Sequence, residues 1–393
     1  MRERMLFLSA KNHQTQDLEG DIRTGRFLKI LQEKYEIDHL FYRNSSRELS
    51  VTGGSQFIAY KERGALTSRR TKLRSLYKLR DYAYRSSTGK NMRDNLTDLC
   101  RSNTYSHVFI SHSLLQNCID IIRHLLPEAT IITDAYRFKG GMSIGEAVGK
   151  RILITPYQKL NAALVRRDER NLLNKTGLLL ATSEWDALSF KSLSFADASK
   201  VHVVPHFIDM HQYEYTEPVL KENSIVLYWD MNTSPGKQVA LLFFHKIYSR
   251  IKAKVPDVRC YIVCREVPPE VAELGKEDNS INITGPLDNA AEYIRKAKAV
   301  IAPLLDNCGA RMSVLESWAL RTPVVSSTKG SEGLNCEHNR NILLASTAKD
   351  AVDNIVSLLQ DSGLGGLIAD RAHQTLLKHY EANSVRAKIL SLV

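Results

Sequence analysis

The chain has 393 residues, of which 43% are hydrophobic and 25% charged, and its formal net charge is +11. The length favours two domains over one, and the composition is that of a globular protein with sizeable cores. No segment approaches the roughly 20 apolar residues that span a bilayer, and the first residues lack the apolar core of a signal peptide, so we expect a cytoplasmic protein. The positive charge indicates an anionic partner: a nucleic acid, a membrane surface or a phosphorylated ligand.

The first half of the chain alternates short apolar runs with helical patterns. The expected strands are Met5–Ala10, Glu36–Tyr42, Phe57–Tyr60, His107–Ser111, Thr130–Ala135, Leu178–Ser183 and Val201–Pro205. Several are apolar at nearly every position, which is typical of parallel strands buried on both faces. A helix is expected over Gly20–Tyr35, where Phe27, Leu28 and Leu31 share one face. This alternation of strands and helices predicts a doubly wound parallel sheet.

A strongly basic stretch lies within this first half. Between Lys61 and Asp94 there are eleven basic residues and three acidic ones. Within it, Lys72–Arg85 combines apolar residues near helical spacing with basic neighbours. The pattern fits an interfacial helix on anionic lipid, and it equally fits an amphipathic helix packed on its own sheet. No recognised nucleic-acid motif is present, so we do not expect nucleic acid as a partner.

The pattern of strands and helices restarts after Val203–Glu222, a polar and aromatic stretch that we interpret as a hinge. The strands expected beyond it are Ser224–Asp230, Arg259–Arg265, Ile281–Gly285, Ala299–Leu304, Pro323–Thr328 and Asn341–Ala345. The helices expected there are Pro235–Lys254, Asn289–Lys296, Gly309–Leu320, Thr347–Gln360, Leu367–Tyr380 and Asn383–Leu392.

This organisation predicts an α/β protein with two Rossmann-like doubly wound domains that face a central cleft, where such sheets bind ligands at the carboxyl ends of their strands. The first domain is expected over residues 1–203 and the second over 204–375. A helical tail over 376–393 either crosses back to the first domain or packs wholly on the second. The residues that could form an apolar stripe for the crossover are Ala387, Ile389, Leu390 and Val393.

The segment Ala302–Ser327 carries the clearest chemical pattern, a strand, a turn, a helix and a second strand. Gly309 and Ala310 lie at the turn, just before a helix start whose free N–H groups and positive dipole end favour an anion. Arg311, in the first turn, can pair with a diphosphate. Glu316 follows five residues later and can accept hydrogen bonds from ribose hydroxyls. These parts together predict a sugar-nucleotide site.

This pattern, Gly309-x-Arg311-x-x-x-x-Glu316, resembles the donor site of the retaining group-1 (family 4) glycosyltransferases, which have the GT-B fold. Further segments that resemble the family, in the same order, are Ala181–Glu184, Val204–Asp209, Thr284–Leu287, Ala302–Leu304, Pro323–Val325 and Gly330–Leu334. The resemblance is strong over residues 178–380 and weak over 1–177.

The resemblance implies a nucleotide-diphosphate sugar as donor, transfer with retention, and a glycan or lipid-linked acceptor. It further implies a role in surface polysaccharide or glycoconjugate synthesis, with the protein cytoplasmic or peripheral on the inner face of the membrane. Near the start, Gly20 and Arg23 resemble the glycine loop and opening helix that face the donor. His112 either contacts the donor sugar, as a family histidine does, or is a half-buried structural residue. Asp134 either caps a helix or orients an acceptor hydroxyl.

The chain departs from the family where many members place a lysine two residues after the arginine, because Ser313 stands there. Lys237, in the loop that opens the first helix of the second domain, could supply the missing charge. A non-catalytic subunit of a glycosylation complex is the alternative function. No Asp-x-Asp motif and no Cys-x-x-Cys pair is present, so we expect free thiols, no metal ion and no cofactor.

Overall fold

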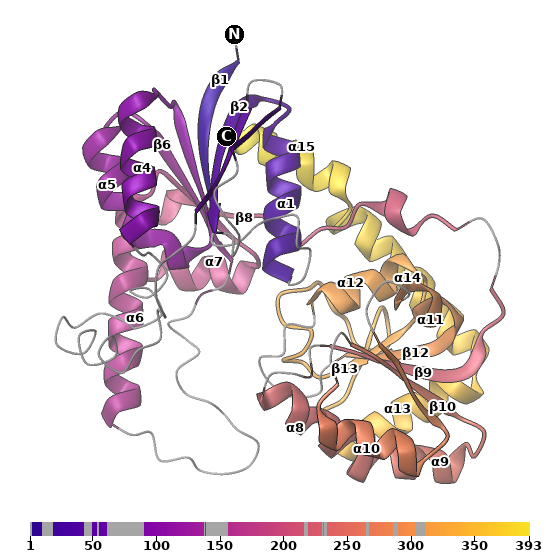
Figure 1. The fold of residues 1–393 in the computed structure, drawn as a ribbon. Helices are drawn as coiled ribbons and strands as arrows, with labels where there is room; N and C mark the ends of the chain where they lie inside the picture. The colour runs from indigo at the N-terminus through magenta and orange to yellow at the C-terminus, as the bar shows by residue number, and fades with distance from the viewer. Residues whose placement is uncertain are drawn as a thin grey trace. The chain divides into compact units, whose positions relative to one another are not determined.

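The structure is a computed structural model that describes residues 2–9, 19–42, 49–52, 55–60, 90–136, 138, 156–215, 219–229, 231, 234–264, 267–285, 290–302 and 311–393. It divides into two compact units: unit 1 is Met1–Pro205 with Arg386–Val393, and unit 2 is His206–Val385. Each unit holds one sheet with helices on both faces, which confirms the predicted α/β class with two doubly wound domains (Figure 1). Among the helices described, none is long and apolar enough to cross a membrane.

Unit 1 contains an eight-stranded sheet in the order β3-β4-β2-β1-β5-β6-β7-β8. Its strands are β1 (Glu3–Ser9), β2 (Tyr35–Tyr42), β3 (Leu49–Thr52), β4 (Ser55–Tyr60), β5 (His107–Ser111), β6 (Thr130–Tyr136), β7 (Leu178–Ala181) and β8 (Val201–Val203). All neighbours are parallel except β3 and β4, which pair antiparallel with Leu49 opposite Ile58. The strand order reverses between β1 and β5, because the chain first adds strands on one side of β1 and then returns to the other.

The helices of unit 1 cover both faces of this sheet. They are α1 (Glu19–Leu31), α4 (Lys90–Ser102), η1 (Ser113–Cys118), α5 (Ile119–Leu125), α6 (Pro156–Lys175), α7 (Glu184–Lys191) and η2 (Ala198–Lys200). One face packs under α4, α5, α6 and α7. The other face meets α1, where the ring of Phe27 lies 5.1 Å from Phe109 and Phe109 stacks on Phe7 at 4.8 Å (Figure 1). Alternate residues of β1 therefore enter two cores.

The last helix, α15 (Ala382–Leu392), ends in unit 1. Ile389 is fully buried there, Arg386 forms an ion pair with Glu33, and the Lys34 ammonium donates to the carbonyl of Val393. Ala387, which the sequence placed in the apolar stripe, is exposed because it lies on the opposite side of the helix from Ile389.

Unit 2 contains a six-stranded parallel sheet in the order β11-β10-β9-β12-β13-β14. Its strands are β9 (Glu222–Tyr228), β10 (Arg259–Val263), β11 (Ile281–Gly285), β12 (Ala297–Ile301), β13 (Val324–Ser326) and β14 (Leu343–Leu344). The helical elements are η3 (Met210–Tyr213), α8 (Ser234–Phe243), η4 (Phe244–Tyr248), α9 (Ser249–Lys254), α10 (Pro269–Glu277), α11 (Ala290–Lys296), α12 (Arg311–Ala319), α13 (Ala348–Gln360) and α14 (Ser362–His379). Here the strand order reverses between β9 and β12.

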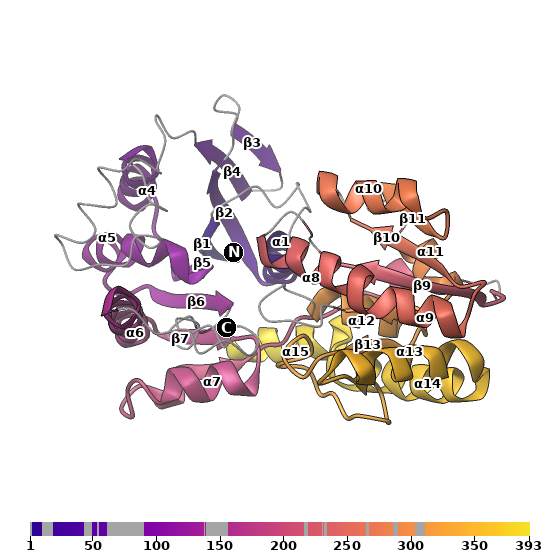
Figure 2. The ribbon, with the colours of Figure 1, turned by 90° about the horizontal axis from the view of Figure 1, so that it is seen from below.

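The two faces of this second sheet also carry separate cores. The core on one face includes residues of α8, η4, α9, α10 and α13, and the core on the other includes residues of α11, α12 and α14, with Trp318 fully buried (Figure 2). The helix expected over Pro235–Lys254 is not continuous in its hydrogen bonding, because η4 is a π-helical segment within it. Thr347 and Asp350 form a capping box at the start of α13.

Candidate ligand-binding site

Each sheet offers one natural ligand position. In open α/β sheets, ligands bind outside the carboxyl ends of the strands where the strand order reverses. In unit 2 this point lies between β9 and β12, and in unit 1 between β1 and β5. Because β9 and β12 are neighbours, the helices that follow them, α8 and α12, begin at the same edge of the sheet. Of the candidate residues that the structure describes, Lys237, Arg311, Ser313 and Glu316 lie on the helices at the first point, and Gly20 and His112 follow β1 and β5 at the second.

Helix α12 presents its amino end at the unit 2 edge. It begins at Arg311, so its first N–H groups lack partners within the helix and its dipole favours an anion there. Gly309 and Ala310, expected at the preceding turn, lie outside the described residues. Ser313 is buried, and its carbonyl accepts a hydrogen bond from the Ser317 hydroxyl at 2.6 Å. A neutral residue therefore occupies the place where the family resemblance puts a lysine.

Glu316 lies on the same helix, is partly exposed and has a partner that sequence reasoning missed. The Tyr213 hydroxyl donates to its Oε1 at 3.0 Å. Tyr213 ends η3, a short turn within the stretch interpreted as a hinge, and it is 103 residues away in the chain. The aromatic character of that stretch was the only sequence signal for it.

A tight loop follows β13 at this edge. The Ser327 hydroxyl accepts from the Gly330 N–H at 2.9 Å, and the Ser331 N–H donates to the Ser327 carbonyl at 3.1 Å. Gly333 has φ 84°, a left-handed conformation that glycine adopts without strain. The Tyr380 hydroxyl accepts from the Asn335 N–H at 2.7 Å and so fixes the end of the loop. The segment 330–334 that resembles the family is thus a hydrogen-bonded turn.

Lys237, expected in the loop that opens this helix, lies in the first turn of α8, and its ammonium is 2.8 Å from the Glu270 carboxylate. Both side chains are exposed to solvent, at 37% and 53%. The hydrogen bond from Lys237 lowers the pKa of Glu270. Pairs this exposed are readily exchanged, so an anion at the α8 amino end would compete with Glu270 for this cation.

In unit 1, Gly20 and His112 lie on either side of the β1/β5 reversal. Gly20 is the second residue of α1, and His112 directly follows β5. His112 has φ 88°, which is rare outside glycine. Its N–H donates to the Asp134 carbonyl at 2.9 Å, and its carbonyl accepts from the Leu115 N–H at 3.1 Å. These bonds hold a conformation that costs on the order of 1–3 kcal/mol and that clusters at functional sites.

Arg23 and Asp134 do not serve the roles that the sequence suggested for them. Their side chains are each 2% exposed and form an ion pair through two hydrogen bonds, of 2.8 and 2.9 Å. The Arg23 guanidinium also donates to the carbonyls of Val204 and Pro205 at 2.7 Å. Arg23 therefore points into the protein instead of toward a donor. Asp134 is neither a helix cap nor an exposed acceptor ligand, because its carboxylate is occupied by Arg23.

Among the described residues, the buried cysteines form no further candidate centre. Cys100, Cys118, Cys260 and Cys264 are buried thiols outside any disulfide, and burial raises the pKa of each of the first three. Such thiols are poor nucleophiles. Across the described ranges, no group of His, Cys, Asp and Glu side chains could hold a metal ion. The basic segment Lys72–Arg85, which was expected to be an amphipathic helix, lies outside the described residues.

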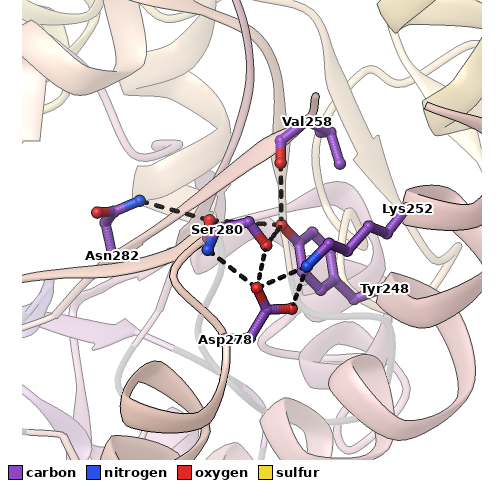
Figure 3. A network of polar contacts seen from close by, with 6 residues as sticks. All are labelled: Tyr248, Lys252, Val258, Asp278, Ser280 and Asn282. Atoms are coloured by element: carbon purple, nitrogen blue, oxygen red, sulfur yellow. Dashed lines mark hydrogen bonds and ion pairs between the residues drawn. The ribbon is translucent and has the colours of Figure 1, made fainter. Parts of the chain in front are cut away.

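A groove of about 610 Å³ lies beside η4, at the amino ends of β10 and β11. The Tyr248 hydroxyl donates to Ser280 Oγ at 2.9 Å, and the Lys252 ammonium bonds both carboxylate oxygens of Asp278 at 2.6 and 2.7 Å (Figure 3). Asp278 also accepts from the Ser280 N–H. These groups satisfy one another, and they lie at the opposite edge of the sheet from Arg311 and Lys237, so the network is structural.

The fold is GT-B, and three comparisons with known proteins agree with this architecture. Residues 227–361 match the family described as "Glycosyl transferases group 1". Sucrose-phosphate synthase from Thermosynechococcus elongatus superposes with a TM-score of 0.72 at 12% identity, over 100% of this chain and 98% of that one. Anabaena HepE in complex with UDP and glucose superposes with a TM-score of 0.67 at 11% identity, over 99% of both chains.

A curated relative aligns with only about half of the chain. An uncharacterized 44.6 kDa protein in the cps region of Klebsiella pneumoniae is 22% identical over 216 residues. The aligned part is 53% of this chain and 56% of the relative.

The match to the glycosyl transferase family, residues 227–361, lies within unit 2. This unit also holds Lys237, Arg311, Ser313 and Glu316.

Proposed function

We propose that the protein transfers a glycosyl group from a nucleoside-diphosphate sugar to a glycan or lipid-linked acceptor, with retention at the anomeric carbon. The observation that carries this proposal is the amino end of α12, with Arg311 and Glu316, at the strand reversal of the unit that matches the group 1 family. The bond between the anomeric carbon and the diphosphate oxygen breaks, and a bond to the acceptor oxygen forms. The acceptor hydroxyl loses its proton, and the diphosphate leaves with the bonding electrons.

The residues at the site have complementary roles in this proposal. Arg311 and the α12 dipole neutralise the departing diphosphate, and Lys237 contributes once the anion displaces Glu270. Glu316 accepts hydrogen bonds from the ribose. Gly309, Ala310 and Ser313 are proposed as contacts of the phosphates. The family resemblance also implies that Gly20 and His112 contact the donor sugar, whose transition state carries oxocarbenium-like charge.

Charge neutralisation by Arg311, Lys237 and a helix dipole would make a divalent ion unnecessary, and we propose a metal-independent, cofactor-independent enzyme. Transfer should therefore continue in EDTA. Activity that disappears with the chelator and returns with manganese would overturn this part of the proposal while leaving sugar transfer itself intact.

The alternative is a non-catalytic subunit of a glycosylation complex. Two observations favour it: Ser313 stands where the family resemblance expects a lysine, and Lys237 is already paired with Glu270. A thermal-shift panel of UDP, GDP, dTDP and CMP tests donor recognition, since a ligand that binds the folded state raises the melting temperature. Hydrolysis or transfer of the matching sugar nucleotide then separates the two functions. Binding without any turnover would favour the subunit, and no binding of any nucleotide would contradict the transferase.

For its place in the cell, we propose the cytoplasm at the inner face of a membrane, in surface polysaccharide or glycoconjugate synthesis. The relative in the cps region supports the polysaccharide context. Three large apolar side chains in and just after α7 are exposed: Trp185 at 46%, Leu188 at 64% and Phe195 at 98%. The outer face of the neighbouring α6 exposes basic residues, namely Arg166, Arg167 and Arg170. Aromatic residues beside basic ones suit an anionic lipid surface.

Sedimentation with vesicles of phosphatidylglycerol and phosphatidylcholine tests this location. The protein should sediment with them, less so at high salt, because exposed charges are screened within about 10 Å at 0.1 M. Replacing Leu188 and Phe195 with serine should reduce sedimentation, whereas replacing the exposed Leu367 of α14 should not. Unaltered sedimentation of the first variant would remove this surface from the proposal.

A further inference from the structure

Glu316 is the carboxylate of the α12 site, and its hydrogen bond to Tyr213 suggests how it is held. The Tyr213 hydroxyl is 3.0 Å from Glu316 Oε1. The Tyr213 ring packs against the core that contains Leu315 and Trp318 of the same helix. The phenol therefore approaches the carboxylate from a ring that is partly buried against the core beneath α12.

The segment that leads into the turn of Tyr213 is held by backbone hydrogen bonds to the residues between α14 and α15. The Ile208 N–H donates to the Tyr380 carbonyl at 2.8 Å, and the Ile208 carbonyl accepts from the Ala382 N–H at 2.8 Å. The Asp209 side chain then caps η3 by accepting from the His211 N–H at 3.2 Å. Two well-separated parts of unit 2 thus determine where the hydroxyl lies.

We propose that Tyr213 positions the Glu316 carboxylate for the ribose hydroxyls and so determines the preference for a ribonucleotide over a deoxyribonucleotide. This inference rests on the proposed function, in which Glu316 meets the ribose. An ionised carboxylate only accepts hydrogen bonds and offers about four acceptor positions, of which the phenol takes one. A carboxylate held in one orientation by this bond suits a ligand with adjacent hydroxyl donors. A site built for a hydroxyl discriminates strongly against an analogue that lacks it.

The test compares the affinities of ribonucleotides and deoxyribonucleotides for the wild type and for a variant without the phenol hydroxyl. Calorimetry gives the Kd of UDP, GDP and their 2′-deoxy forms for the wild type and for Tyr213→Phe, which removes only the hydroxyl. We expect the preferred ribonucleotide to bind about 3- to 10-fold more weakly to the variant, the range of one lost hydrogen bond. The deoxy form should lose less, so the ratio of the two Kd values should fall. In a Glu316→Gln background, Tyr213→Phe should have little further effect.

Tyr293→Phe is the matched control, because that ring packs on Tyr261 at 5.0 Å, away from Glu316. It should leave both Kd values unchanged. The ligand-free melting temperature of Tyr213→Phe should equal that of the wild type, since a purely structural role would lower it without altering the ratio. A wild type that prefers the ribonucleotide, with an unchanged ratio in Tyr213→Phe, would overturn the role of Tyr213 alone. A wild type that binds dTDP but neither UDP nor GDP would overturn this inference alone, whereas one that binds no nucleoside diphosphate would overturn the proposed function together with it.

Discussion

The guanidinium of Arg23 and the carboxylate of Asp134 form a buried ion pair with two hydrogen bonds, although 111 residues separate them in the chain. Through its remaining N–H groups, Arg23 also holds the carbonyls of Val204 and Pro205, the last residues of unit 1 before the chain enters unit 2. One side chain thus joins α1, the end of β6 and the exit from unit 1.

Removing the carboxylate of this pair should destabilise unit 1 strongly. Asp134→Ala leaves a buried guanidinium without its counter-charge, and we expect a loss of about 3–5 kcal/mol in the free energy of unfolding, measured in urea. The control is Asp353→Ala, which breaks the Lys254–Asp353 pair, whose side chains are 51% and 48% exposed. Breaking such a surface pair should cost no more than about 1 kcal/mol. Equal losses in the two variants would contradict the assigned role of Arg23.

Arg311→Ala should weaken binding of the cognate nucleoside diphosphate by more than ~1.5 kcal/mol, the scale of a charge-assisted hydrogen bond. Calorimetry is the measurement. Arg321→Ala is a suitable control, because this arginine follows the other end of α12 and pairs with Asp370 on the surface. If both variants bind like the wild type, Arg311 does not belong to the site.

Lys221 should make the stability of unit 2 depend on pH. Burial, followed by repulsion from Arg295, lowers the pKa of Lys221 from 10.5 to about 8, and its ammonium donates to the Thr322 hydroxyl. Below the folded pKa the lysine is protonated in both the folded and the unfolded state. The cost of burying its charge then lowers the free energy of unfolding by its full amount. Between the two values the unfolded chain binds more protons, so the free energy of unfolding rises with pH.

Replacing Lys221 removes this effect. Lys221→Met should therefore raise the urea midpoint near pH 7, and the gain should shrink by about pH 10. Lys254→Met, at an exposed lysine, serves as the matched variant. A Lys221→Met gain that is constant across this range, or absent at neutral pH, would show that Lys221 carries no such cost.

The tail should contribute to the stability of unit 1. Ile389 is fully buried, and Ile389→Ala should lower the free energy of unfolding by about 2–4 kcal/mol through lost burial and the cavity left behind. Lys388→Ala, at an exposed position of the same helix, should have little effect. Truncation after His379 should exceed the Ile389 loss, since it also removes Arg386 and its pair with Glu33. A truncated protein with the wild-type melting temperature would show that the tail is dispensable.

Much of the fold could be predicted from local pattern. The strands His107–Ser111 and Ile281–Gly285 were predicted with their observed bounds. The first has an apolar centre, Val108–Ile110, that is fully buried, and the second alternates apolar and polar residues at the edge of its sheet. Strand β3 was not predicted, because apolar and polar residues alternate over only four positions at the edge of the sheet, which is too short a pattern to indicate a strand. The π-helical segment was missed as well, because apolar periodicity does not report which carbonyl each N–H meets.

The contacts of the candidate site residues could be anticipated only where those residues are close in sequence. Arg311 and Glu316 share one helix, and their spacing carries the family pattern. The partners of Glu316 and Lys237, namely Tyr213 and Glu270, depend on tertiary packing that no local pattern encodes. For the same reason Arg23 was assigned to a ligand: nothing near it in the sequence shows that Asp134 would neutralise it.

At His112, whose backbone is left-handed, the residue that best stabilises the fold and the residue that could contact the donor are expected to differ. Glycine would adopt φ 88° without strain, so a library at residue 112 that is sorted for thermal stability should converge on glycine, followed by asparagine. The same library sorted for sugar transfer should retain histidine if the imidazole meets the donor. Divergence of the two sorted pools would reveal a residue kept for chemistry at the expense of stability. Convergence on glycine in both would make His112 an ordinary turn residue.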